Sequence, residues 1–180
     1  MCGRYHFGIN DSKKGRKIKE RTEKLDLVFK TGDVFPGNSV LCVIPKGSAL
    51  DLAVKKWGIK NKSFQINARL ESIPEKISYK DMKENRCAVL CDGFYEWDAS
   101  KEKYFITFNE EYMYLACIYN DDDELLIITR EASEVFDGIH DRMPVILDEE
   151  EMHKYLNGED YLCETKDLHV NKAEYEVPLF

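Results

Sequence analysis

The sequence has no long apolar run, and this excludes several classes of protein. No stretch approaches the roughly 18 apolar residues that a membrane-spanning helix needs. The first residues, MCGRYHFGIN, turn polar before an apolar signal core can form. Repeats, low-complexity segments and interdomain linkers are also missing from the sequence. We therefore expect a single domain over residues 1–180, located in the cytoplasm and with no membrane partner.

A metal-binding cysteine pattern is lacking as well, although the chain contains 6 cysteines. Cys87 and Cys91 have the spacing C-x3-C, but no second Cys or His pair follows at the spacing of zinc ligands. Without a secretion signal, disulfide bonds are not favoured. The segments LCVI, RCAVLC and LACIY indicate buried cysteines that act as small hydrophobic side chains. We expect neither a metal nor a cofactor.

What the sequence does contain is enough apolar material for a packed core. Hydrophobic residues make up 43% and aromatic residues 12% of the chain, which excludes intrinsic disorder as the main state. The net charge of −8 is unevenly distributed, because residues 1–90 contain 19 Lys and Arg against 10 Asp and Glu, and residues 91–180 contain 7 against 24. The basic half could offer a positive groove to a polyanion, or the charge could have diverged along the chain without function.

Hydrophobic periodicity predicts a mixed α and β architecture. An apolar face recurs at helical spacing over residues 11–29, and Asp148 begins a second helix with Glu151 at the position that a capping box requires. Shorter helices are predicted over residues 78–85 and 131–139. β-branched and aromatic residues predict strands at 40–45, 52–57, 63–67, 87–91, 93–97, 103–108, 112–119, 124–130, 143–147 and 168–174. The predicted class is α+β, a single domain with a mostly antiparallel β-sheet core, open and barrel-like or folded over itself, and peripheral helices.

Cys2 is the most informative residue for function. Removal of Met1 would expose an α-amine and a thiol on adjacent carbons. Both groups are partly nucleophilic near neutral pH, because their reference pKa values are about 8 and about 8.5. With an aldehyde such a pair forms an imine and closes to a five-membered thiazolidine, whereas with an acyl carbon the thiol attacks and the amine serves as base. A cysteine can equally stand second by chance.

Three polar islands lie in apolar surroundings: Asn67-Ala68-Arg69, Glu96, and His140-Asp141-Arg142. Glu96 could face solvent, but in a buried position it would have a raised pKa and could donate a proton near pH 7. His140 could be structural or catalytic. The two arginines could form ordinary ion pairs or clamp phosphates. No island is specific by itself, but the joint occurrence of all three with Cys2 is.

Five segments resemble, in order and spacing, the signature blocks of the SRAP family (SOS response-associated peptidase; abasic-site processing proteins): MCGRY, KKWG, INARLES, RCAVLCDGFYEW and IHDRMPVIL. The resemblance covers essentially the whole chain. It implies a monomeric protein of the DNA damage response that binds single-stranded DNA containing abasic sites and associates with the nucleoid on that DNA. It further implies a covalent thiazolidine crosslink to the ring-opened deoxyribose, a lyase or self-reversal activity, and the peptidase activity that the family name records.

The resemblance also implies roles for the polar islands. Cys2, after Met1 removal, matches the covalent nucleophile. Asn67 matches the residue that holds the N-terminus and the sugar. Glu96 matches the acid/base that assists ring opening and proton transfer, and His140 matches the residue that moves the proton of the sugar hydroxyl and acts in Schiff-base chemistry and crosslink reversal.

DNA contacts are implied in the same way. Arg4, Arg69 and Arg142 match positions that contact phosphates beside the lesion. Pro36 and Trp57 match positions that pack against unstacked bases, where aromatic stacking typically contributes ~1–3 kcal/mol per base. The stretch around Pro36 reads DVFPGN, where the family usually has Tyr-Asn before Ala-Pro.

Two other functions fit parts of the sequence. A Cys-Gly start is similar to that of class II glutamine amidotransferases, in which an N-terminal cysteine attacks an amide. This hypothesis of a cysteine amidohydrolase leaves the GFYEW and HDRMP segments unexplained. A non-covalent single-stranded-DNA binding module would leave Cys2 incidental.

Overall fold

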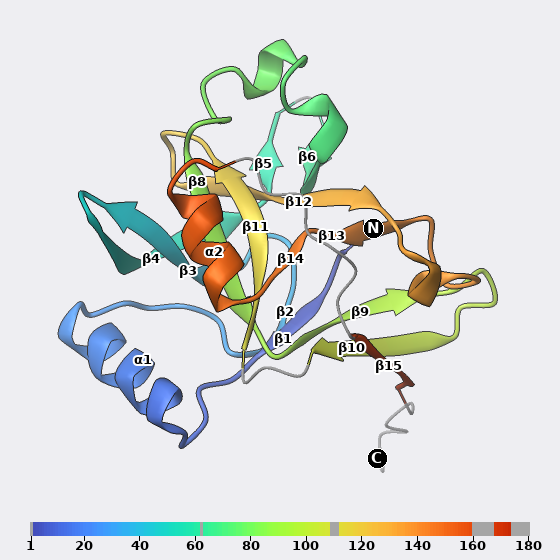
Figure 1. The fold of residues 1–180 in the computed structure, drawn as a ribbon, viewed down its shortest axis with the longest axis horizontal. Coiled ribbons are helices and arrows are strands. Elements are labelled where there is room, and N and C mark those ends of the chain that lie inside the picture. Colours follow the sequence, from blue (N-terminus) through green and yellow to red (C-terminus); the bar gives the residue numbers. More distant parts are fainter. Residues whose placement is uncertain (1, 62, 109–111, 160–167, 174–180) are drawn as a thin grey trace.

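Two β-sheets carry most of the described chain, and two α-helices lie at their periphery (Figure 1). The structure is a computed structural model, and it describes residues 2–61, 63–108, 112–159 and 168–173. In the first sheet the strand order is β15 (Leu168–Lys172), β10 (Lys103–Phe108), β9 (Gly93–Trp97), β1 (Tyr5–Phe7) and β2 (Gly32–Val34). This sheet brings the start of the chain beside the GFYEW segment, since Tyr5 pairs with Phe94.

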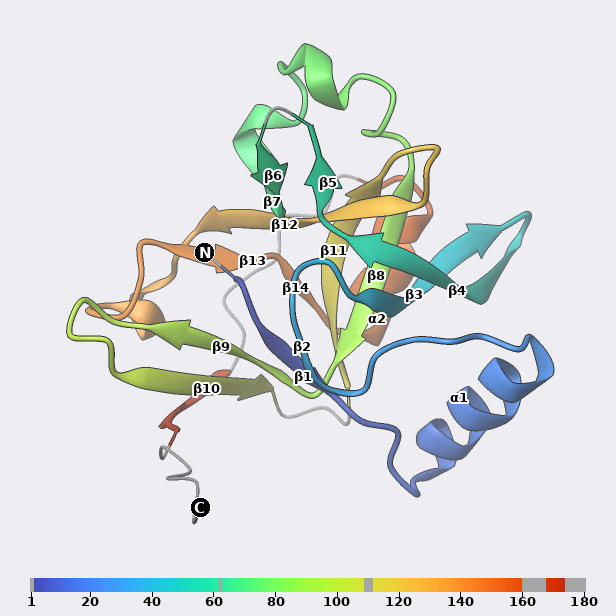
Figure 2. The ribbon, with the colours of Figure 1, turned by 180° about the vertical axis from the view of Figure 1, so that it is seen from behind.

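The second sheet is larger and folds over the first (Figures 1 and 2). Its strand order is β13 (Arg142–Pro144), β12 (Glu124–Glu131), β4 (Ala49–Trp57), β3 (Ser39–Lys46), β8 (Arg86–Cys91), β11 (Met113–Tyr119) and β14 (Ile146–Leu147). In addition, β12 pairs with β11 and with β7 (Asn67–Arg69), and β5 (Ile59–Lys60) pairs with β6 (Phe64–Gln65). Among the described pairings, only those of β12 with β4 and β7 are parallel, which confirms the predicted mostly antiparallel core.

The core lies between these sheets and is built from continuous apolar strands. Along β8 and β11 nearly every side chain is buried, so these strands read as apolar runs rather than as alternating patterns. The cysteines Cys42, Cys87, Cys91 and Cys117 are buried free thiols in this core. The prediction that these segments hold cysteines as small hydrophobic side chains is therefore confirmed.

The first helix is shorter than the periodicity predicted. α1 spans Lys13–Lys24 rather than residues 11–29, with Ser12 as its N-cap accepting a hydrogen bond from the Gly15 amide. It ends where Asp26 adopts a positive φ of 50°, which a helix cannot contain. Ile18 and Thr22 form the buried face of α1.

The second helix matches its prediction, and two shorter ones do not. α2 spans Glu149–Leu156, and Asp148 and Glu151 form the expected reciprocal capping box. The helix predicted over residues 78–85 is wrong: the segment has only a 3-10 turn, Ile77–Tyr79, followed by turns. The helix predicted over 131–139 reduces to a 3-10 turn, Glu134–Phe136. Both segments bury too few side chains to hold an isolated short helix together.

The predicted strand over residues 143–147 is divided in two. β13 pairs with β12, whereas β14 pairs with β11, so Val145 marks the crossing between partners. A further 3-10 turn, Leu70–Ser72, follows β7. Within the described part of the chain, no helix has the length and apolarity required to cross a membrane.

Candidate functional site

Cys2 lies just before β1 and is completely buried. Its carbonyl oxygen accepts a hydrogen bond from Nδ2 of Asn67 at 2.9 Å. Asn67 is held there because β7 pairs with β12 and places Asn67 opposite Ile127. Two segments that are 65 residues apart in the sequence thus meet at the start of the chain.

Glu96 shares this buried region with Cys2. It lies in β9, where side chains alternate between faces, so Glu96 is only 3% exposed while its neighbours Tyr95 and Trp97 lie on the other face. Burial raises the pKa of the Glu96 carboxyl, and the nearby charge of His140 partly offsets this. Burial, followed by the charge of Glu96, raises the pKa of the Cys2 thiol far above its usual value. The thiol is therefore protonated at neutral pH and needs a base to react as a thiolate.

His140 precedes β13 and has two contacts at the same ring nitrogen. Nδ1 lies 2.9 Å from the backbone nitrogen of Arg142 and 2.8 Å from Oδ1 of Asp141. The two contacts hold the imidazole ring in place just before β13.

Arg4 lies at the beginning of β1, next to the buried cysteine. Its guanidinium group pairs with the carboxylate of Asp33 in β2 and lies over two aromatic rings, 4.7 Å from the centroid of Tyr95 and 5.0 Å from that of Phe35. Partial burial acts to raise the pKa of Asp33, but the hydrogen bond and charge of Arg4 hold it below its usual value. Arg4 also lines an open groove of about 740 Å³ along β1, β9, β10 and β15.

The other two arginines lie on either side of β12, since Arg69 pairs with Thr129 and Arg142 pairs with Glu131. Arg142 makes two hydrogen bonds to the Glu71 carboxylate, at 2.6 and 3.1 Å, and these lower the pKa of that carboxyl. Arg69 is exposed. In this structure Arg142 is therefore an ion-pair partner, and a phosphate would have to share it with Glu71 or displace Glu71.

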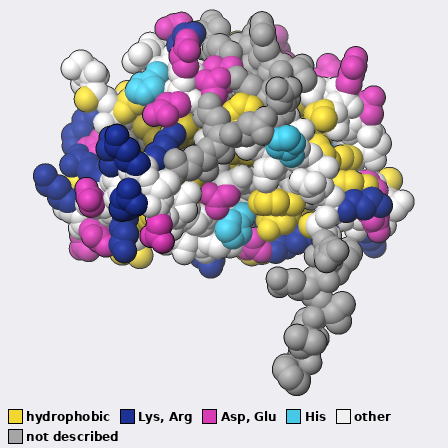
Figure 3. Space-filling model, turned by 60° about the horizontal axis from the view of Figure 1, so that its bottom comes forward, with side chains coloured by type: hydrophobic (Ala, Val, Ile, Leu, Met, Phe, Trp, Pro, Cys, Tyr) yellow, Lys and Arg dark blue, Asp and Glu magenta, His cyan; other side chains and the backbone are white. Residues whose placement is uncertain are grey.

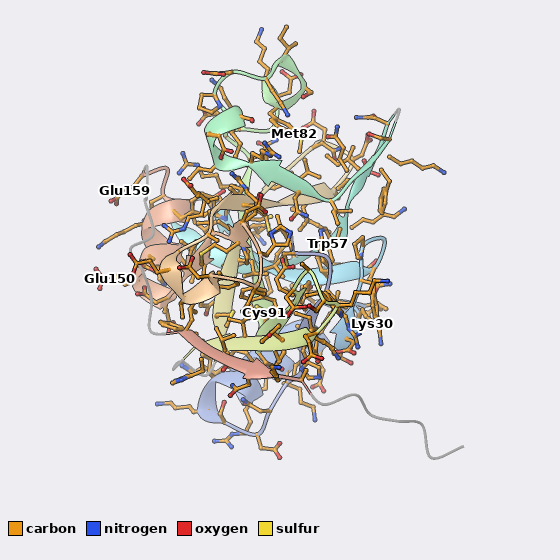
Figure 4. All side chains as sticks on the ribbon, turned by 90° about the vertical axis from the view of Figure 1, so that its right-hand side faces the viewer. Lys30, Trp57, Met82, Cys91, Glu150 and Glu159 are labelled. Carbon is orange, nitrogen blue, oxygen red and sulfur yellow. The ribbon has the colours of Figure 1, made fainter. Side chains whose placement is uncertain are left out.

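Trp57 does not lie where base stacking requires it. It is 0% exposed, its ring packs at 5.4 Å from Tyr5, and its Nε1 donates to the carbonyl of Ile66 at 2.9 Å. Figure 4 shows it within the body of the molecule. The expectation that Trp57 packs against unstacked bases is thus corrected, because both faces of the ring are covered by the core.

Pro36 is partly exposed in the loop after β2, and the residue before it, Phe35, is more exposed. Phe35 is 45% exposed, and its ring lies under the guanidinium group of Arg4. An exposed aromatic ring beside a cation is a surface on which a base can stack. The sequence analysis did not single out Phe35 as a candidate contact residue, although the DVFPGN stretch departs from the family pattern at this position.

Trp57 leads to a prediction about stability. Replacing it with alanine is expected to lower the free energy of unfolding by about 3–5 kcal/mol, as is typical of a large buried ring. Urea unfolding followed by circular dichroism would measure this. Phe64→Ala is the matched control, because Phe64 is 50% exposed, and a change of no more than about 0.5 kcal/mol is expected there. Equal effects of the two variants would contradict a core role for Trp57.

Metal-binding groups do not gather at this site. Across residues 2–61, 63–108, 112–159 and 168–173, no three His, Cys, Asp or Glu side chains come together in a way that could hold a metal ion. The chemistry available from the described side chains is that of a thiol, two proton-transfer groups, an amide donor and several guanidinium groups.

Comparison with known proteins decides the family. The family model described as "SOS response associated peptidase (SRAP)" matches residues 1–177. The chain belongs to the SRAP family. Its relatives include the abasic site processing protein YobE of Bacillus subtilis, 33% identical over 156 residues that cover 72% of this chain and 71% of YobE. The abasic site processing protein HMCES of Gallus gallus is 34% identical over 125 residues, covering 51% of this chain and 37% of HMCES.

Solved structures of the same fold accompany these SRAP relatives. A protein from Bordetella bronchiseptica superposes with a TM-score of 0.76 at 17% identity, covering 96% of this chain and 100% of that one. One from Bacteroides thetaiotaomicron superposes with a TM-score of 0.74 at 21% identity, covering 97% and 93%. At these identities the likeness concerns the fold alone, and it agrees with the predicted mostly β, α+β class.

Proposed function

We propose that this SRAP protein binds single-stranded DNA and captures abasic sites covalently through Cys2 once Met1 has been removed. The observation that carries the proposal is that Asn67, Glu96 and His140, from three separate segments, lie around Cys2 at the start of the chain. Cys2 and Glu96 are buried, whereas Asn67 and His140 are partly exposed. The protein would act as a monomer in the cytoplasm, on DNA of the nucleoid.

The proposed chemistry begins with the sugar. An abasic deoxyribose opens when the O1′ hydroxyl loses its proton and O4′ gains one, which frees the C1′ aldehyde. Glu96 and His140 are the groups available for these transfers. The α-amine of Cys2 then adds to C1′, and loss of one water gives an imine. Finally the thiol adds to the imine carbon, its proton passes to the nitrogen, and a thiazolidine ring closes.

Asn67 and the burial of the site support this sequence of steps. The Asn67 hydrogen bond fixes the carbonyl of Cys2 and thereby the direction of its amine and thiol. Fixing both nucleophiles at one carbon removes much of the entropic cost of ring closure. Hydrolysis of the imine, with Glu96 and His140 acting in reverse, would account for self-reversal, and β-elimination from the imine would account for a lyase activity.

DNA recognition in this proposal relies on the backbone, since an abasic site has no base to read. Arg69, which is exposed, and Arg4 would contact phosphates, and Arg142 would do so after release from Glu71. Phe35 and Pro36 would cover a neighbouring base. The paired state of Arg4 and Arg142 means that phosphates must compete with carboxylates for both groups.

Intact-mass spectrometry tests the proposal directly. Met1-free protein is incubated with a single-stranded oligonucleotide that carries one abasic site. The expected mass is that of protein plus oligonucleotide minus one water, and it should survive denaturation. A matched oligonucleotide with an intact base is the control. Absence of the adduct with Met1-free protein would overturn the proposal, and salt-dependent binding without an adduct would favour a non-covalent binding module instead.

The amidohydrolase alternative has a separate readout. An N-terminal cysteine hydrolase acting on glutamine would release ammonia without any DNA present. Ammonia release that depends on Cys2, together with no adduct on abasic DNA, would replace the proposed function by that one.

A further inference from the structure

α1 carries an unusually dense positive charge that the candidate site does not use. Its 12 residues, KKGRKIKERTEK, contain seven Lys and Arg and two Glu. Figure 3 shows Lys and Arg side chains gathered at the end of the molecule where α1 lies, with acidic side chains among them. The helix wheel places Lys13, Lys17 and Lys24 within one narrow arc on the exposed side, since they differ by 4 and 7 positions.

The helix is fixed to the body through other residues. Arg21 makes a bidentate contact with Asp51 at 2.7 Å, and Lys14 pairs with Glu149 at 2.9 Å. Ile18 and Thr22 bury the opposite face. Lys13, Lys17 and Lys24 are exposed and form no ion pair with any described residue. Glu20 is also exposed and lies in the same arc, between Lys17 and Lys24. The row of three lysines, which we call the α1 lysine row, is therefore a rigid surface that remains cationic, with three positive charges against one negative charge.

We propose that the α1 lysine row binds the phosphate backbone of the DNA that flanks the captured lesion. The row spans about 16 Å at the helical rise of ~1.5 Å per residue. A DNA strand presents one phosphate per ~3.4 Å of axis, so the row faces about five consecutive phosphates. This inference rests on the proposed function, because it takes the strand held at Cys2 as the molecule whose flank is bound.

Two features favour nucleic acid over a lipid surface. A helix that binds a membrane must expose its apolar face, and the apolar face of α1 is buried against the protein. The exposed side of α1 also has no aromatic side chain. The α1 lysine row would therefore contact backbone charge, without stacking on bases, which suits phosphates of either a single strand or a duplex.

The position of α1 predicts a length requirement. β1 leads away from Cys2, and α1 lies at the far end of the molecule from the beginning of β1 in both ribbon views (Figures 1 and 2). The eleven residues from Cys2 to Lys13 span at most about 40 Å when extended. At ~3.4 Å per nucleotide, about 12 nucleotides are enough to cover this maximum distance. A flank of 15 nucleotides is therefore long enough to reach the α1 lysine row, and we expect a flank of three nucleotides to be too short.

The test compares the triple variant Lys13→Gln/Lys17→Gln/Lys24→Gln with the wild type. Binding is measured by fluorescence anisotropy across a salt series, on abasic single strands with 3-nucleotide flanks, with a 15-nucleotide flank on the 5′ or the 3′ side, and with a duplex flank. On one long-flank substrate, the slope of log K against log salt should become less negative by about 2 for a single strand, since each phosphate contact contributes ~0.7. Affinity at 0.1 M salt should fall about 10- to 100-fold there.

The controls separate this inference from the proposed function. Lys76→Gln/Lys80→Gln/Lys83→Gln removes the same charge from three exposed lysines elsewhere and should leave the slope unchanged. An equal slope change in both triple variants, or none on any long flank, would overturn the inference while adducts on the short oligonucleotide keep the proposed function. The inference would also be overturned if the triple variant lost affinity for anionic vesicles but bound DNA as the wild type does. Failure of the wild type to form any adduct would overturn the proposed function independently of the lysines.

Discussion

Cys2→Ser should abolish the denaturation-resistant adduct with abasic DNA. Serine keeps the α-amine, so an imine with the C1′ aldehyde can still form. The hydroxyl is a much weaker nucleophile than a thiol, and without ring closure the imine hydrolyses when the protein is denatured. Borohydride, which reduces the imine to a stable amine, should restore an adduct with Cys2→Ser, whereas the wild type should need no reductant. Gel electrophoresis in SDS with and without borohydride measures both outcomes.

Cys91→Ser is the matched control for this change. Cys91 is also completely buried and lies close enough to Cys2 for their charges to interact. The Cys91→Ser substitution should lower the stability of the fold, because a polar hydroxyl replaces a buried thiol, but it should leave the adduct intact. An adduct from Cys2→Ser that resists SDS without borohydride would contradict the thiazolidine, and loss of the adduct in Cys91→Ser at a temperature where it remains folded would implicate the wrong thiol.

Much of the fold could be predicted because its signals are local. The strands β8 to β12 are long apolar or β-branched runs separated by turn residues, and the Asp148–Glu151 capping box is a four-residue pattern. The failures came where local signals were weak. Residues 78–85 contain good helix formers, yet in that segment only Tyr79 and Met82 are buried, so the core does not stabilise a helix there.

The residues of the candidate site could be predicted from the sequence, but the ion pairs around it could not. Cys2, Asn67, Glu96 and His140 could be singled out from the sequence and the family resemblance. That Arg4 pairs with Asp33 depends on the register of β1 against β2, which places His6 opposite Asp33, and no local pattern gives a register between strands 29 residues apart. The Glu71–Arg142 pair depends likewise on β7 and β13 flanking β12.

Trp57 shows that a family resemblance predicts which residue occupies a position better than it predicts whether that residue is exposed. The Trp-Gly pattern at 57–58 is preserved, and Gly58 adopts a φ of +105° that other residues rarely tolerate. The ring itself is enclosed by Tyr5 and the backbone of Ile66. An exposed aromatic surface is instead available at Phe35, which lies just before the turn at Pro36 and Gly37.

Glu96→Gln should slow adduct formation by about 10²- to 10⁴-fold, the usual contribution of a positioned proton-transfer group. Glutamine has nearly the same shape, so the buried region should stay packed. It can neither accept the proton that ring opening releases nor take the proton of the Cys2 thiol. The measurement is the rate constant for adduct formation on a saturating abasic oligonucleotide between pH 5 and 9. In Glu96→Gln the part of its pH dependence that arises from the Glu96 carboxyl should disappear. Phe94 is buried beside it, and Phe94→Leu serves as a packing control that should retain the wild-type pH profile.

The same substitution should raise stability at high pH. Because burial raises the pKa of Glu96, the folded wild type holds this proton more tightly than the unfolded chain does. The free energy of unfolding therefore falls as pH rises from the ordinary glutamate pKa through the raised value, and below that window the penalty is absent. Glu96→Gln has no such group, so it should be more stable than the wild type at pH 8 and similar at pH 4, by urea unfolding at both pH values. A wild type that is more stable than Glu96→Gln at pH 8 would mean that the carboxylate is satisfied in its buried position. It would then be a structural group rather than a proton-transfer group kept at a cost in stability.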